Sequence, residues 1–278
     1  MPSWSFAQDR WVQSTPAALK SRVKGGLRQT LLTLGYDVRR VPKPSWIRDP
    51  WQVQRRLLQH VERPVIFDVG ANVGQTLERY ASTVRDARIH SFEPFPDSYR
   101  HLAAVAAARP PAVAHQLALG AARGEATFHV NPQFHTRNSL LTRPAEGRRY
   151  YRKGSELPET LTVTVDTLDD VCAREGIDRI NLLKLDVQGA ELQVLRGGER
   201  LLAREAVDII FMEVMFVPHY ENGPLFHEVH AELRGRGYSL YNIFDLISAT
   251  NGQLRYANAL FVSDSLRSTV LDAFAPEP

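Results

Sequence analysis

From Pro64 onward, short runs of β-branched and other apolar residues alternate with stretches whose apolar residues recur at helical spacing. This alternation is typical of a mostly parallel sheet with helices on both faces, so we expect an α/β fold. The pattern predicts strands at 65–69, 88–92, 113–119, 126–130, 161–165, 180–187, 207–214, 238–244 and 257–262. It predicts helices at 75–84, 96–108, 166–175, 191–204 and 225–235.

The N-terminal segment has a different character. Residues 1–63 contain 12 Lys and Arg against 4 Asp and Glu, a balance of +8, whereas the whole chain carries only +3. Within 17–40, apolar residues at helical spacing are separated by basic ones, which predicts an amphipathic basic helix. The prolines at 42 and 44 then break the helix. We therefore expect a basic helical arm with a linker over 1–63 and a main domain over 64–278.

The role of this arm is open on sequence grounds. Its helix could pack on the main domain or on a second subunit of a homo-oligomer, or it could contact an anionic membrane surface or a partner of a biosynthetic complex. No helix-turn-helix, zinc or RNA-binding signature accompanies the charge, so we do not expect a nucleic-acid partner.

Composition narrows the class of protein. With 278 residues, 44% of them hydrophobic and 23% charged, the chain suits a folded domain and not a disordered or fibrous protein. No apolar stretch reaches the roughly 18 residues of a membrane span, and the N-terminus does not resemble a signal peptide. The single cysteine, Cys172, excludes an intramolecular disulfide and fits a reducing compartment. We expect a cytoplasmic protein.

Candidate binding residues follow the first two predicted strands. In parallel sheets, ligands bind at the carboxyl ends of the strands. The first strand runs into a turn from Asp68 to Gly74, in which Gly70 and Gly74 allow the backbone to approach a ligand closely. Glu93 follows the second strand, 19 residues after Gly74. A carboxylate there is placed to accept both hydroxyls of a ribose.

The spacing of this turn discriminates between cofactors. Dinucleotide sites use G-x-G-x-x-G, whereas this turn has G-x-x-x-G preceded by Asp68. A pyrophosphate beside Asp68 would be repelled, but an ammonium and a sulfonium would be attracted. The turn therefore favours S-adenosylmethionine over a nicotinamide dinucleotide, and an incidental turn without a ligand is the structural alternative.

Five motifs in order resemble those of the FkbM-type S-adenosylmethionine methyltransferases. They are FDVGANVG at 67–74, FEP at 92–94, NSL at 138–140, VDTLD at 165–169 and KLDVQGAE at 184–191, followed by VLRG at 194–197. The match covers about 64–262, and position 188 of the last motif, Gln188 here, is typically Glu or Gln in the family. The resemblance implies a Rossmann-like class I methyltransferase fold and methylation of hydroxyls on sugars, glycans or secondary metabolites.

The resemblance also implies roles for single residues. Those matching the cofactor-tail motif are Asp68, Gly70, Asn72 and Gly74, and Glu93 matches the ribose acid. Asp186 ends the strand at which cofactor and acceptor meet. Asn138 and Ser139 match a segment of the site wall that would contact the substrate. The residues that would line the adenine are Leu117, Ala118 and Leu119.

Methyl transfer to a hydroxyl needs an in-line acceptor and a destination for the hydroxyl proton. Our first candidate base is Asp186, the second Glu213 at the end of the next strand, and the third His135 or His219. Asp186 could instead orient the cofactor, and Glu213 could be a supporting acid. Both could hold magnesium or calcium, but no third ligand is evident, so a metal is not favoured.

Two further expectations concern the surroundings of the site. Lys184 lies inside a buried strand, so we expect an acidic partner for its charge. The insertion over 131–159 combines six basic residues with Tyr150 and Tyr151, which suits either an acceptor lid or a solvated loop. We expect an O-methyltransferase with a small-molecule or glycan acceptor. The alternatives are an N-methyltransferase of a small metabolite or peptide and an inactive cofactor-binding scaffold.

Overall fold

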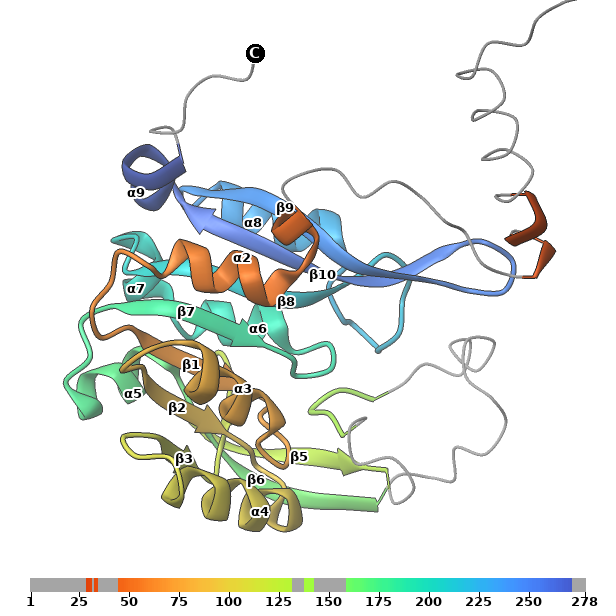
Figure 1. The fold of residues 1–278 in the computed structure, drawn as a ribbon. Coiled ribbons are helices and arrows are strands. Elements are labelled where there is room, and N and C mark those ends of the chain that lie inside the picture. The colour runs from red at the N-terminus through yellow and green to blue at the C-terminus, as the bar shows by residue number, and fades with distance from the viewer. Residues whose placement is uncertain (1–28, 32, 35–44, 132–137, 143–158, 272–278) are drawn as a thin grey trace, which may run out of the picture. The chain divides into compact units, whose positions relative to one another are not determined.

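A seven-stranded sheet forms the centre of the catalytic domain (Figure 1). The computed structural model describes residues 29–31, 33–34, 45–131, 138–142 and 159–271. The strand order is β3-β2-β1-β7-β8-β10-β9; the first five strands pair in parallel, and β10 pairs antiparallel with β8 and β9. The strands are β1 Val65–Val69, β2 Arg88–Phe92, β3 Val113–His115, β7 Ile180–Leu185, β8 Val207–Met215, β9 Tyr238–Ser248 and β10 Leu254–Ser263.

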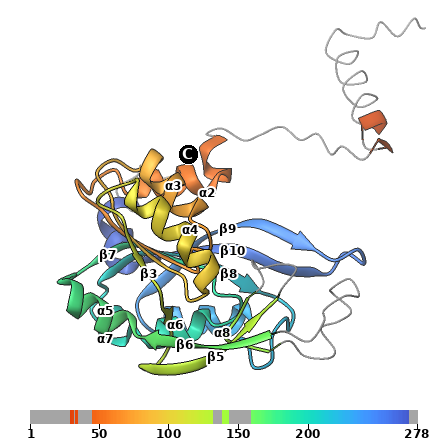
Figure 2. The same ribbon diagram turned by 90° about the horizontal axis from the view of Figure 1, so that it is seen from below.

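Helices cover both faces of this sheet. Figure 2 shows α2, α3 and α4 on one face and α5, α6, α7 and α8 on the other. The order of the strands reverses beside β1, so the predicted Rossmann-like arrangement is confirmed. None of the described helices is long and apolar enough to cross a bilayer. The helices are α2 Pro50–Leu57, α3 Gln75–Thr83, α4 Pro96–Ala107, α5 Leu168–Glu175, α6 Glu191–Arg196, α7 Glu199–Ala203 and α8 Phe226–Arg234.

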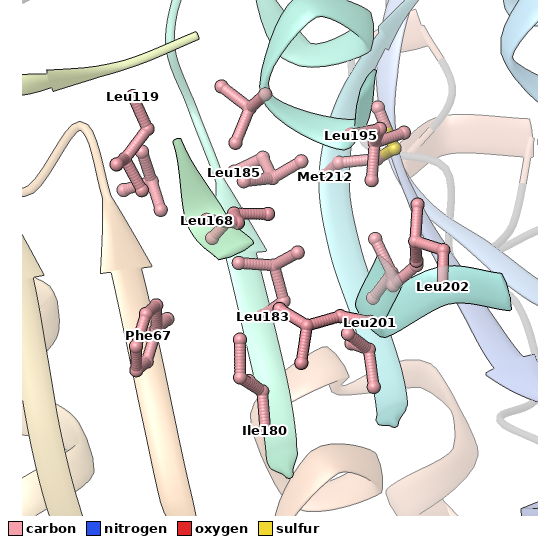
Figure 3. Packing of buried hydrophobic residues seen from close by; sticks show 14 of the residues in the cluster. Phe67, Leu119, Leu168, Ile180, Leu183, Leu185, Leu195, Leu201, Leu202 and Met212 are labelled. Atoms are coloured by element: carbon pink, nitrogen blue, oxygen red, sulfur yellow. The ribbon is translucent and has the colours of Figure 1, made fainter. Parts of the chain in front are cut away.

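The largest part of the core lies between the central strands and the helices of one face (Figure 3). All six residues of β7 are buried and four of them are apolar, which fits a central strand covered on both faces. Burial of each large apolar side chain stabilises the fold by about 1.5 to 3 kcal/mol. The side chains labelled in Figure 3 are Phe67, Leu119, Leu168, Ile180, Leu183, Leu185, Leu195, Leu201, Leu202 and Met212.

Two predicted elements are wrong because each is broken in the structure. The strand predicted at 113–119 divides into β3, which pairs with β2, and β4 (Ala118–Leu119), which pairs with β6 in a second sheet. The helix predicted at 191–204 is interrupted between α6 and α7, where a Cβ on Gly197 would lie 2.0 Å from the Gly120 carbonyl oxygen. The second sheet has the order β4-β6-β5, with β5 at Gly124–Val130 and β6 at Glu159–Asp166.

The chain divides into two compact units, Met1–Trp46 and Ile47–Pro278. Helix α2 belongs to the second unit, although the sequence analysis assigned residues 1–63 to the arm and linker. Asp49 caps this helix, and Val53 is fully buried. The Tyr80 hydroxyl donates to Gln54 Oε1 at 2.7 Å. These contacts favour a domain that begins before Asp49, and most of the predicted helix at 17–40 lies outside the described residues.

Two truncations test this boundary. A chain that begins at Ile47 is expected to unfold at the same denaturant concentration as the full chain, because it keeps α2. A chain that begins at Pro64 loses Val53 and the Trp51 ring, which packs on Tyr80 and Phe211. We expect it to be less stable by at least about 3 kcal/mol in chemical denaturation followed by circular dichroism. Equal stability of the two truncations would support the predicted boundary at Pro64.

Candidate functional site

A pocket opens at the carboxyl ends of β1, β2 and β7, where the sequence analysis predicted the ligand site. Most of the predicted binding residues contribute to it, but Asp68, Gly74 and Ser139 are not among the described lining residues. The pocket is also lined by Phe128, Leu140, Lys184 and Gln188. The predicted residues that line the pocket are Gly70, Asn72, Glu93, Leu117, Ala118, Leu119, Asn138 and Asp186.

The turn after β1 lies directly against the turn after β7. Gly70 has a φ of +77°, and a Cβ at this position would lie 2.0 Å from the Asp186 carbonyl oxygen. The Gly70 and Ala71 amides both donate to the Phe92 carbonyl oxygen at 3.0 Å, which fixes the turn on β2. Only a glycine permits this approach of the two backbones. The motif glycine therefore shapes the floor of the pocket.

Glu93 is held rigidly at the end of β2. Its Oε2 accepts the Asn72 amide and its Oε1 accepts the Phe95 amide, both at 2.9 Å. Burial raises the pKa of Glu93 to about 7, although the two backbone hydrogen bonds oppose the shift. Each carboxylate oxygen has a second lone pair, so the group still has acceptor capacity for a diol.

Asp68 is fully buried beneath the pocket and faces Lys184. The Lys184 Nζ lies 3.1 Å from Asp68 Oδ1 and 3.8 Å from Asp186 Oδ2, and it donates to the Gly70 carbonyl oxygen at 3.3 Å. The predicted acidic partner of Lys184 is therefore confirmed. Burial lowers the pKa of Lys184, but the neighbouring carboxylates raise it overall, so the ammonium stays charged. Asp68 pairs with Lys184, and it is Lys184 that lines the pocket. Direct contact of Asp68 with a ligand stays a prediction.

The first two candidate bases, Asp186 and Glu213, share one neighbour. Gln188 Nε2 donates to Asp186 Oδ1 at 2.9 Å and to Glu213 Oε2 at 3.3 Å. The Asp186 side chain is 46% exposed and lines the pocket. Burial and the Asp186 charge raise the pKa of Glu213 to about 8. At neutral pH Glu213 is therefore mostly protonated, which makes Asp186 the better placed proton acceptor.

The two candidate histidines differ in what the structure describes. His219 is buried, and its Nδ1 lies 3.0 Å from the Val217 carbonyl oxygen. A carbonyl oxygen only accepts, so Nδ1 carries the proton and Nε2 accepts from Arg255 Nη2 at 3.1 Å. Both ring nitrogens are thus engaged, which disfavours His219 as a base. His135 lies outside the described residues.

The segment with the NSL motif, residues 138–140, contacts the turn after β7. Asn138 lines the pocket, and its Oδ1 accepts the Asn131 amide at 2.8 Å. The Ser139 hydroxyl donates to the Gln188 carbonyl oxygen at 2.7 Å. Ser139 therefore supports the turn after β7, while Asn138 faces the pocket.

The sequence analysis did not identify Gln188 or Tyr220 as site residues. The Tyr220 hydroxyl donates to Gln188 Oε1 at 2.6 Å from 32 residues away, and no sequence spacing signals this contact. Among the described residues, no cluster of three or more His, Cys, Asp or Glu side chains is arranged to hold a metal ion.

The pocket as a whole suits S-adenosylmethionine. Leu117, Leu119 and Phe128 supply an apolar region for a base, and Glu93 supplies the diol acceptor. Asp186 adds an anionic group that would attract a sulfonium. The residues present therefore fit a nucleoside that carries a positively charged amino-acid tail.

Comparisons with known proteins identify the family of the chain. The model of the methyltransferase FkbM domain matches residues 68–240. The 2-O-methyltransferase NoeI of Sinorhizobium fredii is 26% identical over 194 residues, which cover 67% of this chain and 76% of NoeI. The 31-O-demethyl-FK506 methyltransferase FkbM of Streptomyces tacrolimicus is 31% identical over 201 residues, covering 63% of this chain and 73% of that protein.

A third relative is the hexuronic acid methyltransferase AglP of Haloferax volcanii, 27% identical over 170 residues that cover 60% of this chain and 63% of AglP. The matched family domain contains the Gly70 turn, Glu93, Asp186 and Glu213, and it spans more than half of the chain. The chain therefore belongs to the FkbM family of S-adenosylmethionine-dependent methyltransferases, as its motifs predict.

Proposed function

We propose that the protein is an O-methyltransferase that acts on a hydroxyl of a sugar, a glycan or a natural product. The observation that carries this proposal is the exposed Asp186 carboxylate, which lines the pocket at the end of β7. A hydroxyl is a weak nucleophile until its proton has an acceptor. The names of NoeI and FkbM, both O-methyltransferases, support the same reaction class, and the name of AglP supports a sugar acceptor.

The cofactor would lie along the turn after β1. We propose that Gly70 and Asn72 approach its tail, that Glu93 accepts its ribose hydroxyls, and that Leu117–Leu119 line its adenine. When bound, it supplies the methyl group: the acceptor oxygen bonds to the methyl carbon as the carbon–sulfur bond breaks, with its electron pair left on sulfur. The protein contributes orientation and exclusion of water.

Asp186 would take the proton of the acceptor hydroxyl. Lys184 lies 3.8 Å from one of its oxygens, and Gln188 donates to the other. Both neighbours interact favourably with a carboxylate, one as a cation and the other as a hydrogen-bond donor. Asn138, which lines the pocket, would help to bind the acceptor, and Ser139 would support the turn after β7.

A transfer assay tests the proposed function. The protein is incubated with S-adenosylmethionine that carries a tritiated methyl group and with a panel of neutral sugars, uronic acids and hydroxylated natural products. We expect label on at least one hydroxylated acceptor and none on its deoxy analogue. Transfer only to amines would overturn O-methylation, and cofactor binding without any transfer would favour the scaffold alternative.

Cofactor affinity is expected to depend on pH through Glu93. A ribose donates to the ionised carboxylate, so binding lowers the Glu93 pKa from its value of about 7. Affinity for S-adenosylhomocysteine should therefore increase as pH rises toward about 7 and level off above it. In calorimetry, Glu93→Gln should weaken binding by about 1 to 3 kcal/mol and remove this dependence. A dependence that persists in the variant would exclude Glu93 as its origin.

A further inference from the structure

The turn after β7 places one amide side chain between the two candidate bases. Gln188 adopts a left-handed backbone conformation, with a φ of 55°. Its Nε2 is the donor to both Asp186 Oδ1 and Glu213 Oε2. The two carboxyl groups are therefore held on either side of a single nitrogen atom.

One contact orients this amide, and two others fix the turn that carries it. The Tyr220 hydroxyl donates to Gln188 Oε1 at 2.6 Å, and the Ser139 hydroxyl donates to its backbone oxygen at 2.7 Å. Gly189 packs against the Tyr220 ring so closely that a Cβ there would lie 2.6 Å from Tyr220 Cδ2. Because Oε1 already accepts a hydrogen bond, the NH₂ group must point toward Asp186 and Glu213.

We propose that Gln188, oriented by Tyr220, is a positioning residue for proton removal: its NH₂ group holds Asp186 as the carboxylate that faces the pocket and Glu213 as its protonated partner. This inference rests on the proposed function. A donor shared by two acids stabilises whichever one is ionised. With the amide reversed, its oxygen would repel an Asp186 carboxylate, so the hydrogen bond from Tyr220 favours the orientation in which the NH₂ group faces Asp186.

The charges around the pair agree with one ionised and one neutral acid. Burial raises the pKa of Glu213 to about 8, with Asp186 and Glu191 adding to the shift and Lys184 opposing it. Burial raises the pKa of the neighbouring Glu191 to about 7, and the Glu191 side chain accepts the Val187 and Gly189 amides. Lys184 Nζ lies 3.8 Å from Asp186 Oδ2 and also pairs with Asp68. A second negative charge on Glu213 is thus disfavoured at neutral pH.

The pH dependence of turnover tests the proposal. Gln188→Met keeps the length of the side chain but removes the donor, and Tyr220→Phe removes only the orienting hydroxyl. Loss of the donor favours the protonated acid, so the acidic limb of the kcat profile should move up by about one to two pH units in Gln188→Met. It should move by less in Tyr220→Phe, and kcat should recover at high pH in both. Tyr99→Phe, on α4, should leave the limb unchanged.

A merely structural role predicts a different pattern. Both variants would then lose kcat by the same factor at every pH, or KM for the cofactor would rise while the limb stayed in place. Either result overturns the proposal.

A measurement without acceptor separates this proposal from the proposed function. Carbon-13 NMR of labelled carboxyl groups, assigned with Asp186→Asn and Glu213→Gln, follows the pair directly. We expect the Glu213 carboxyl to titrate well above an ordinary glutamate, and Gln188→Met to raise the pH at which Asp186 titrates. These shifts in a protein without transferase activity would support the positioning role while the proposed function fails. An Asp186 titration that is unchanged in Gln188→Met would overturn the positioning role alone.

Discussion

Asp186→Asn is expected to lower kcat by about a hundredfold or more while affinity for S-adenosylhomocysteine changes little. The amide has the shape of the carboxyl group but cannot take the acceptor proton. It keeps the close approach of the two turns, because the atoms of residue 186 nearest to the position of a Cβ on Gly70 are those of its backbone carbonyl group. Single-turnover assays with saturating cofactor measure the loss in the chemical step, and calorimetry measures the affinity.

Asp178→Asn is the matched control, since Asp178 is an exposed aspartate outside the pocket lining. It should keep full turnover. If turnover survives in Asp186→Asn while cofactor binding collapses, Asp186 orients the cofactor and is not the base. Glu213 would then become the leading candidate base.

Gly70→Ala is expected to abolish measurable cofactor binding and to destabilise the domain by about 2 to 5 kcal/mol. The new Cβ would meet the Asp186 carbonyl oxygen at 2.0 Å, so the turns after β1 and β7 must move apart. The φ of +77° at residue 70 adds backbone strain for any residue other than glycine. Calorimetry and chemical denaturation measure the two effects.

Gly176→Ala separates the clash from the strain. Gly176 also has a positive φ, +63°, but a Cβ there would meet nothing within 4 Å. This control should lose only about 1 kcal/mol of stability and bind cofactor normally. Wild-type binding by Gly70→Ala would mean that the contact between the two turns does not shape the site.

Much of the fold could be predicted from local pattern. The bounds of β1 and β2 match the predicted strands, because each strand is followed directly by a clear turn signal. The strand predicted at 113–119 failed since β3 and β4 belong to different sheets, and a pattern of apolar residues does not name the partner strand. Helix α2 was not predicted, although Asp49 and Pro50 give the cap and first-turn signals of a helix start.

The site was predictable where its residues directly follow strands. Gly70, Glu93 and Asp186 do so, and strand ends in a parallel sheet converge on one edge. The environment of Asp186 was not predictable, because Tyr220 reaches Gln188 from a loop 32 residues further along the chain. Asp68 shows a related limit: its motif suggested contact with the ligand, whereas its oxygen faces Lys184 at 3.1 Å, a distance set by the pairing of β1 with β7.

The most direct test of the central claim is to follow the methyl group itself. The protein, with Asp186→Asn beside it, is incubated with S-adenosylmethionine carrying a carbon-13 methyl group and with fractionated extract of its host, and the products are examined by NMR. We predict a new methyl resonance in the range of an ether on oxygen, dependent on the wild-type protein and about a hundredfold weaker with the variant. A methyl resonance on nitrogen, or no labelled product although the protein binds the cofactor, would contradict it.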